Sequence, residues 1–264
     1  MNGSREIIMD TFSKNKIKVY HASEQIVKYP QWDYKCDDGI TKTRKDFGEG
    51  FYVCENPEYP IALYSDRYQT ETTVYLNEYI FDTTGLEALI LSDNLYWVMV
   101  VAAHRRNFKK HTPWHEFRDA IKDTLGMYQL ITGPISNDCL FSTMNLFLEN
   151  LCTDEVLLEC MRYVEYPLQY VTKCDYADKN FKWVEAAEIF PKKLRESFES
   201  LAKRTLDMED EIKKKQSSQR RNIRERKRAG EIIAEGRLFE DILSDWEDSG
   251  KPKGKELQIF LGGL

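Results

Sequence analysis

The sequence predicts an α+β protein whose first 190 residues mix strands and helices and whose remainder is helical. Upstream of Phe190, short aromatic and β-branched runs bounded by Gly, Pro and Asn are interspersed with apolar or amphipathic stretches. Downstream of Pro191, the chain is rich in Lys, Glu and Arg, with apolar residues at helical intervals. We therefore expect one mixed domain over residues 1–190 and a charged helical extension over residues 191–264.

Five runs in the first part have the composition of strands: Ile17–Tyr20, Gly50–Val53, Thr73–Phe81, Tyr128–Thr132 and Leu168–Thr172. Between them, Asn94–Asn107 is predicted to be a helix buried on most sides, because its apolar run is continuous, and Thr153–Val164 an amphipathic one. Strict β-α-β alternation is missing and no Gly-rich turn follows the first strand. A doubly wound nucleotide-binding fold is therefore not expected.

The extension is predicted to be helical from Pro191, which suits a first helical turn because its missing N–H would have no partner there. The last helix is expected to stop at Ser249–Pro252. The final segment, Leu257–Leu264, is apolar enough to dock on another part of the molecule. The apolar positions with helical spacing are Leu194, Phe198, Leu201, Leu238, Ile242 and Trp246.

Charge is divided unevenly along the chain. Residues 1–190 carry 20 basic and 29 acidic side chains, a net charge of −9, whereas residues 191–264 carry 18 and 15, a net charge of +3. Lys213–Arg228 alone holds nine bases and one acid. Such a block is typical either of a contact with nucleic acid or a partner protein, or of a solvated helix paired with nearby acids such as Asp210. With a single isoleucine, the block is not expected to bury a face.

Several classes of protein are not expected. The longest apolar run, Leu95–Ala103, is nine residues, which is too short to cross a bilayer, and the N-terminus lacks the pattern of a secretory signal, so we expect a cytoplasmic protein without a membrane segment. Six scattered cysteines without metal-site spacing indicate free thiols and no metal. The signatures of P-loop, dinucleotide-binding, zinc-hydrolase and serine-hydrolase sites are absent.

Two segments could carry chemistry. His21 ends an apolar strand and is followed by Ala22 and Ser23, which leaves room for a ligand to approach the backbone. Gly48 and Gly50 precede Phe51 and Tyr52 and permit a bent backbone, which would place the tyrosine where it could stack on a planar ligand. The alternatives are a structural histidine and a core tyrosine. Asp46 and Asp138 are expected to serve as turn or cap residues.

The order of four strings resembles a bacterial family of unknown function that is grouped with the ADP-ribosyltransferases. They are Tyr20-His-Ala-Ser23, Asp46-Phe-Gly-Glu-Gly-Phe-Tyr52, Trp97-Val-Met-Val-Val-Ala-Ala-His-Arg105 and Ile131-Thr-Gly-Pro-Ile-Ser-Asn-Asp138. The resemblance spans roughly residues 17–175 and does not cover the extension. It implies split β-sheets around an NAD cleft, with a His–Tyr–(Glu or Gln) trio on three strands.

On this resemblance, His21 would hold the nicotinamide-side ribose, Tyr52 would pack on the nicotinamide ring, and Gln169 would be the third member. Ala22, Ser23, Gly50, Phe51 and Arg105 would join them around NAD. The chemistry needs such a trio because departure of nicotinamide leaves an oxocarbenium-like ribose, whose hydroxyls must be fixed and whose charge must be met by a polar group.

Two departures from the family pattern bear on activity. Ala22 stands where glycine usually follows the histidine, and Gln169 stands where toxin-type transferases have glutamate. A glutamine can orient a hydroxyl but cannot act as a base. On the resemblance as a whole, we expect an NAD-dependent ADP-ribosyltransferase acting on a macromolecular acceptor. The alternatives are a catalytically silent module of the same fold that binds a protein or nucleic acid, and an NAD glycohydrolase.

Overall fold

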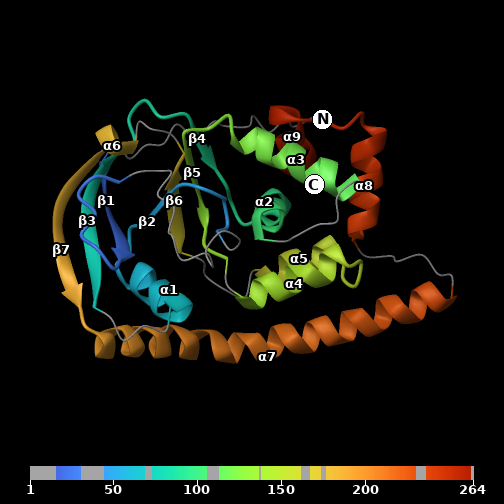
Figure 1. Cartoon of the computed structure of the whole chain (residues 1–264). Coiled ribbons are helices and arrows are strands. Elements are labelled where there is room, and N and C mark those ends of the chain that lie inside the picture. The colour runs from blue at the N-terminus through green and yellow to red at the C-terminus, as the bar shows by residue number, and fades with distance from the viewer. Residues whose placement is uncertain are drawn as a thin grey trace, which may run out of the picture.

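The structure is a computed structural model that describes residues 16–30, 45–68, 73–105, 113–136, 138–161, 167–173, 177–229 and 236–262. The strands lie together at one end of the molecule, most helices form a second layer beside them, and one long helix runs along both (Figure 1). The α+β class predicted from the sequence is confirmed.

The strands form one seven-stranded sheet in the order β4-β5-β6-β2-β1-β3-β7, in which only β4 and β5 pair in parallel. All five predicted strands are present, and β4 and β7 are additional. Their bounds are β1 Lys16–Ser23, β2 Phe51–Cys54, β3 Val74–Asp82, β4 Ala88–Ile90, β5 Leu130–Pro134, β6 Leu168–Thr172 and β7 Phe181–Ile189.

The sheet is continuous but narrows in the middle. A single register pair, Tyr20 opposite Cys54, joins β1 to β2, whereas β1 and β3 pair along eight residues. Two parts, β4-β5-β6-β2 and β1-β3-β7, therefore meet at one pair within a single sheet, where the family resemblance implied split sheets.

Aromatic side chains show that the sheet is strongly curled. Phe51 on β2 and Phe181 on β7 have two strands between them, which would separate them by about 14 Å in a flat sheet. Their ring centroids are 5.5 Å apart, and Phe81 stacks on Phe181 at 4.2 Å. One face of the sheet, the curled face, therefore surrounds an aromatic core made by the strands themselves. The helices pack on the other face.

The helices are α1 Glu58–Tyr68, α2 Leu95–Arg105, α3 Pro113–Leu125, α4 Asp138–Leu148, α5 Asp154–Met161, α6 Ala177–Asn180, α7 Pro191–Ala229, α8 Phe239–Asp248 and α9 Gly254–Gly262. The predicted helices at 94–107 and 153–164 correspond to α2 and α5. As its apolar run indicates, α2 is the central helix, with every residue from Leu95 to Ala103 buried.

The helices after residue 190 share the core of the first part. Trp246 of α8 is 1% exposed and lies edge-on to Phe117 of α3, with ring centroids 5.1 Å apart, and Phe239 meets Trp114 in the same way at 4.8 Å. Leu257 and Leu261 of α9 are buried in the same cluster. The apolar C-terminal segment thus docks as expected, and it does so on the helices of the first part.

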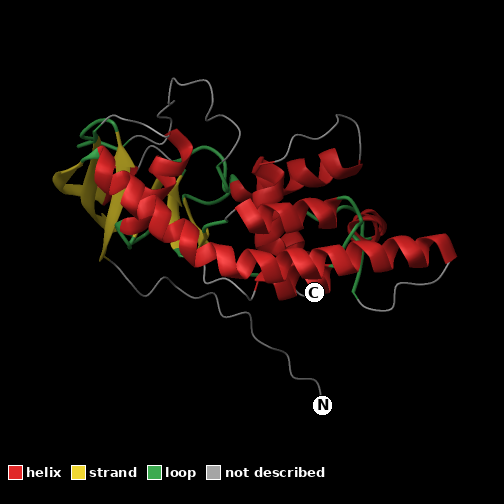
Figure 2. Cartoon of the chain, turned by 90° about the horizontal axis from the view of Figure 1, so that it is seen from below, coloured by secondary structure: helices red, strands yellow, loops and turns green. Residues whose placement is uncertain are grey.

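The long helix α7 crosses the molecule from the strands to the helical layer (Figure 2). Ile212 and Ile223 on it are 2% and 1% exposed, and the side-chain amide of Gln216 donates to Thr143 Oγ1 at 2.7 Å. The expectation that the basic block buries no face is therefore wrong. Its single isoleucine, Ile223, is buried on the same helix face as Ile212, which precedes the block by one residue, and Gln216 between them also finds a partner.

Cys54, Cys152 and Cys160 are free and buried, as predicted for these three thiols. Cys36 and Cys174 lie outside the described residues. In the part of the chain that the structure describes, no helix is both long and apolar enough to traverse a bilayer.

Candidate functional site

The three residues of the expected trio lie on neighbouring strands in the middle of the sheet. β2 lies between β1 and β6, with Cys54 opposite both Tyr20 and Gln169, and with Tyr52 opposite Val171. Side chains alternate between the faces of a strand. Gln169 is directly opposite Cys54, and Tyr52 is two residues before Cys54 on the same strand. The side chains of Tyr52 and Gln169 therefore lie on the same face of the sheet.

The His21 side chain lies on the opposite face. Its ring packs against Phe51 at a centroid distance of 4.5 Å, and Phe51 belongs to the aromatic core on the curled face. Tyr52 instead packs against the core formed with the helices. Ala22, which precedes Ser23 on β1, packs on the helix-facing side against a buried cluster that includes Ile61 of α1 and Leu76 of β3. The structure thus brings Ala22, Tyr52 and Gln169 to one face and leaves the His21 ring on the other.

His21 reaches through the strand pair to the backbone of β2. Its Nδ1 lies 2.9 Å from the carbonyl oxygen of Tyr52. Because a carbonyl only accepts, Nδ1 must carry the proton and donate. Burial lowers the pKa of His21 to about 4, so the ring is neutral near pH 7 and its Nε2 keeps an acceptor lone pair. His21 therefore fixes the backbone of β2 at the residue whose side chain faces the helices.

Ser23 also has structural partners. Ser23 Oγ donates to the Gln25 carbonyl at 2.6 Å and accepts from Asn77 Nδ2 at 3.2 Å. Asn77 is fully buried on β3, opposite His21, and its Oδ1 accepts from the Val27 amide at 2.8 Å. Nothing in the sequence singled out Asn77, which holds the chain just beyond β1.

The Tyr52 hydroxyl closes the turn that precedes its own strand. It accepts from the amide of Phe47 at 3.1 Å and donates to the carbonyl of Gly48 at 2.7 Å. The ring is half-buried, and Lys45 Nζ lies 5.5 Å from its centroid. Tyr52 therefore holds the Asp46–Gly50 segment at the edge of the helix-facing side.

Two glycines of this segment are required by close approach. Gly48 has φ +79°, and a Cβ there would lie 2.6 Å from His104 Cδ2. Gly50 has φ +155°, and a Cβ would lie 2.5 Å from Val171 Cγ1 and 2.7 Å from the Thr172 carbonyl oxygen. The glycine spacing seen in the sequence thus serves close packing of this segment on β6 and on the end of α2.

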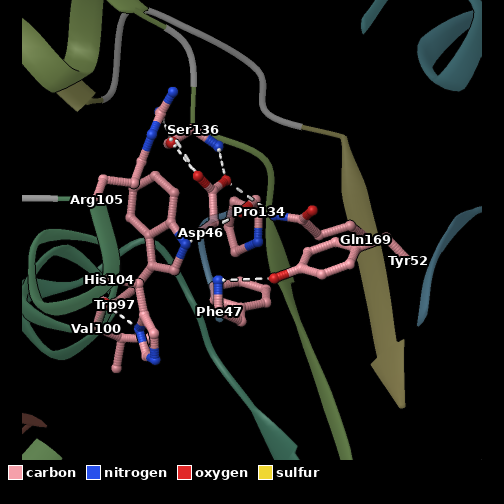
Figure 3. A network of polar contacts seen from close by, with 10 residues as sticks. All are labelled: Asp46, Phe47, Tyr52, Trp97, Val100, His104, Arg105, Pro134, Ser136 and Gln169. Atoms are coloured by element: carbon pink, nitrogen blue, oxygen red, sulfur yellow. Dashed lines mark hydrogen bonds and ion pairs between the residues drawn. The ribbon is translucent and has the colours of Figure 1, made fainter. Parts of the chain in front are cut away.

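Asp46 is the centre of a buried polar network (Figure 3). Its Oδ2 accepts from the Ser136 amide at 2.8 Å and from Gln169 Nε2 at 3.0 Å. Its Oδ1 accepts from Ser136 Oγ at 2.7 Å and lies 3.5 Å from Arg105 Nη1. The carboxylate is 7% exposed. The prediction that Asp46 is a turn residue missed this role, because its partners are about 60 to 120 residues away in sequence.

Arg105 enters the network from the last turn of α2. Its Nη1 donates to Ser136 Oγ at 2.6 Å, and its guanidinium lies 4.8 Å from the ring of Phe141. Arg105 is thus committed to the polar network on the helix-facing side. About two turns earlier on α2, Trp97 Nε1 donates to the Pro134 carbonyl at 3.0 Å, which ties the helix to the end of β5.

Two basic side chains near Gly48 have lowered pKa values: His104 is neutral at pH 7, whereas Lys173 stays mostly charged. Burial lowers the pKa of His104 to about 3 and that of Lys173, which follows β6, to about 8. His104 Nδ1 lies 2.9 Å from the Val100 carbonyl, to which it donates. His104 is thus a neutral packing residue under the glycine turn.

The orientation of the Gln169 amide follows from its neighbours. Its Nε2 lies 3.0 Å from Asp46 Oδ2 and 3.3 Å from the Pro134 carbonyl, and both of these atoms are acceptors. The NH₂ group must therefore face them, and Oε1 faces away. No described residue hydrogen-bonds to that oxygen. Gln169 thus offers one acceptor with a fixed direction on the face that it shares with Tyr52.

The described residues contain no group of three His, Cys, Asp or Glu side chains that could hold a metal ion. On one face of the sheet they place the Gln169 acceptor oxygen, the Tyr52 ring and the small residue Ala22. The Asp46 carboxylate holds Gln169 in place and contacts four polar atoms of three residues. Such a face suits recognition of a planar group with an adjoining hydroxyl.

These features define an α+β protein in which a curled sheet and a central buried helix enclose an aspartate-centred polar network. The chain belongs to the family described as "Protein of unknown function (DUF3990)", whose model matches residues 17–183. The matched region contains every residue of the network and ends within β7. No curated protein and no solved structure matches the chain.

Proposed function

We propose that this protein is an NAD-dependent ADP-ribosyltransferase, which transfers ADP-ribose to a macromolecular acceptor and releases nicotinamide. The observation that carries the proposal is the placement of Tyr52 and Gln169 on one sheet face, with Gln169 Oε1 held away from Asp46. An aromatic ring beside a fixed acceptor is what a nicotinamide ribose requires, because the ring supports the leaving group and the acceptor orients a ribose hydroxyl.

The neighbouring residues are compatible with NAD at this face. Ala22 lies on the same side of β1 and is partly buried, so only a methyl group projects from β1 at this position. The Lys45 ammonium near the Tyr52 ring provides positive charge for a pyrophosphate. His21 takes a positioning role in this proposal, since its ring holds the Tyr52 carbonyl and not the helix-facing side.

The chemistry assigned to these residues is limited by what they can donate and accept. Cleavage breaks the bond between ribose C1′ and the nicotinamide nitrogen, and the electron pair leaves with neutral nicotinamide. The acceptor then forms the new bond to C1′ and loses its proton to solvent, because the Gln169 amide has no basic atom to receive it. Gln169 can align the ribose and stabilise the developing positive charge through its carbonyl dipole.

A catalytically silent binding module is the second candidate, and one observation favours it. Asp46 is the carboxylate nearest to Gln169 in the network, and both of its oxygens are engaged by Ser136, Gln169 and Arg105. A carboxylate engaged in this way supports the site but does not itself meet a substrate. Binding of NAD without release of nicotinamide is the behaviour expected of such a module.

The test uses the full chain and NAD labelled in its adenylate half. The chain is incubated with cell lysate or nuclease-treated lysate, and free nicotinamide, free ADP-ribose and label on macromolecules are measured. Transfer predicts label and nicotinamide in equal amounts, and an NAD glycohydrolase predicts nicotinamide with free ADP-ribose. The silent module predicts a melting shift with NAD and no nicotinamide. Absence of a shift at millimolar NAD would refute the NAD site altogether.

The site is assigned with Gln169→Ala and a matched control. Loss of the fixed acceptor is expected to lower nicotinamide release about tenfold or more. Gln258→Ala removes another glutamine side chain, which lies on α9 and donates to the Tyr128 hydroxyl, and should leave release unchanged. Equal rates in both variants would remove Gln169 from the site.

A further inference from the structure

The two faces of the second half of α7 differ in kind. The inner face carries Ile212, Gln216 and Ile223, which are buried or bonded to α4. Lys215 on this side forms an ion pair with Glu159 of α5. The inner face is thus fully used in holding α7 to the molecule.

The outer face carries six exposed cations, which we call the cationic stripe: Lys213, Lys214, Arg220, Arg221, Arg224 and Arg228. With about 100° of rotation per residue, all six fall within an arc of roughly 120°. They extend over four turns, or about 22 Å along the helix axis. Folding therefore places six of the nine bases of the basic block in a single solvent-facing row.

Four of the six cations have no counter-ion among the residues that the structure describes. Lys214 pairs with Glu211 at 2.8 Å. For Arg220, Arg221, Arg224 and Arg228, no acidic side chain in the described part of the chain lies within ion-pair distance. Arginines three or four residues apart on a helix repel one another. A row of this kind gains most from an external polyanion.

The stripe suits nucleic acid better than a membrane surface. Interfacial helices bury apolar side chains on the face that meets the lipid. The exposed residues among these cations are polar, and they include Ser217 and Ser218, whose hydroxyls can donate to phosphate oxygens. Arginine dominates the distal half of the stripe, and its planar fork matches a phosphate group better than an ammonium does.

We propose that the cationic stripe of α7 is a binding surface for the sugar-phosphate backbone of nucleic acid. It binds without base recognition, because a straight helix face with arginines and serines offers contacts to phosphates only. The surface is separate from the Asp46 network, so it does not depend on NAD chemistry. Transfer to nucleic acid is not required for it.

The test measures binding of the full chain to fluorescent single-stranded RNA, single-stranded DNA and duplex DNA by anisotropy at several salt concentrations. Affinity should fall steeply with salt, because each neutralised phosphate releases counter-ions. Arg220→Gln, Arg221→Gln and Arg224→Gln combined should weaken binding roughly tenfold at low salt and reduce the slope of log K against log salt by about 2.

The matched control changes the same amount of charge elsewhere: Lys182→Gln, Lys192→Gln and Lys193→Gln, at exposed positions on β7 and the first turn of α7. This variant should bind as the parent does. The proposal is overturned if the parent fails to bind at about 50 mM salt, or if both triple variants lose equal affinity. Binding to vesicles containing anionic lipid but to none of the nucleic acids would also overturn it.

Discussion

Gln169 donates a hydrogen bond from Nε2 to Asp46 Oδ2 over 3.0 Å, across 123 residues of sequence. The neighbouring residue of the same segment, Phe47, is held by the Tyr52 hydroxyl. Two members of the expected trio, Gln169 and Tyr52, therefore form hydrogen bonds with consecutive residues of the Asp46–Gly50 segment. The positions that the family resemblance implies for catalysis also determine where this segment lies.

This geometry predicts that Gln169→Glu is destabilising near neutral pH. The new carboxylate would face Asp46 Oδ2 and the Pro134 carbonyl, with no donor between them. Its pKa should rise in the folded state, so the penalty is absent below about pH 4.3, the usual unfolded value, and grows as the pH rises from there toward the raised folded pKa.

Urea unfolding at pH 7 and pH 4.5 checks this prediction. A loss of about 2 kcal/mol in the free energy of unfolding is expected at pH 7, with a smaller loss at pH 4.5. Equal stability of parent and variant at both values would mean that Asp46 does not face residue 169.

Asp46→Asn should cost about 3 kcal/mol of unfolding free energy, because it removes the carboxylate charge that lies 3.5 Å from the nearly buried Arg105 guanidinium. The exposed Asp93, just before α2, provides the control: Asp93→Asn should change stability by less than about 0.5 kcal/mol. Chemical denaturation of both variants at pH 7 decides the matter. Matching midpoints would show that the network contributes nothing to stability.

His21 should make stability fall with acidity. Burial holds its folded pKa at about 4, below the usual value of 6.5. The unfolded chain therefore takes up the proton first, and stability is lost as the pH falls from about 6.5 toward 4, by up to about 3 kcal/mol. His104, with a folded pKa of about 3, acts in the same direction.

Melting temperatures of the parent and of His21→Gln between pH 7.5 and pH 4.5 test this effect. The variant should be less stable at neutral pH, because it loses a packed ring, yet it should show a shallower decline with acid. His104→Gln should flatten the decline independently. An unchanged slope in His21→Gln would contradict a neutral, buried imidazole at this position.

Tyr52 has a hydroxyl that holds a turn and a ring that is proposed to support nicotinamide, and two variants separate these roles. Tyr52→Phe should lower stability by about 1 to 2 kcal/mol through loss of two hydrogen bonds, while NAD still raises the melting temperature. Tyr52→Leu keeps an apolar side chain but lacks the ring, so the NAD shift should disappear. Retention of the full shift in the leucine variant would exclude stacking.

Helices α8 and α9 are predicted to be essential for stability. Trp246 is 1% exposed among aromatic residues of α3 and α8, so Trp246→Ala should cost about 3 to 5 kcal/mol. Ile259, which is 57% exposed on α9, is the control, and Ile259→Ala should be nearly neutral. A chain ending at residue 190 should therefore be poorly folded, and an intact fold in that fragment would show that the extension is an independent unit.

The sequence predicted the parts of the fold that carry a strong local signal. Leu95–Arg105 is recognisable because its apolar run is continuous, and the central strands because they are rich in aromatic and β-branched residues. β7 was missed because it is an edge strand with buried residues mainly at its ends, Phe181 and Ile189, so it lacks apolar alternation. The division at residue 190 remains a prediction, although Trp246 and Leu257 pack with α3.

The candidate site was predictable only as a set of residues. Tyr52 and Gln169 could be singled out because they match motif positions, and strand pairing then placed them on one face. The placement of His21 on the other face depends on register, which a single residue of slip would invert. The role of Asp46 depends on contacts with Ser136 and Gln169, 90 and 123 residues away, for which the sequence carries no local signal.

The large sequence separation between Asp46 and its partners also affects how the protein folds. A carboxylate removed from water without its donors is strongly unfavourable, and here the donors come from α2, from the end of β5 and from β6. Partly folded chains that bury Asp46 before these three elements meet are therefore disfavoured. Assembly of the face that carries Tyr52 and Gln169 is thereby made cooperative with the meeting of α2, β5 and β6, and a chain in which these elements have not met should display no rudimentary form of the site.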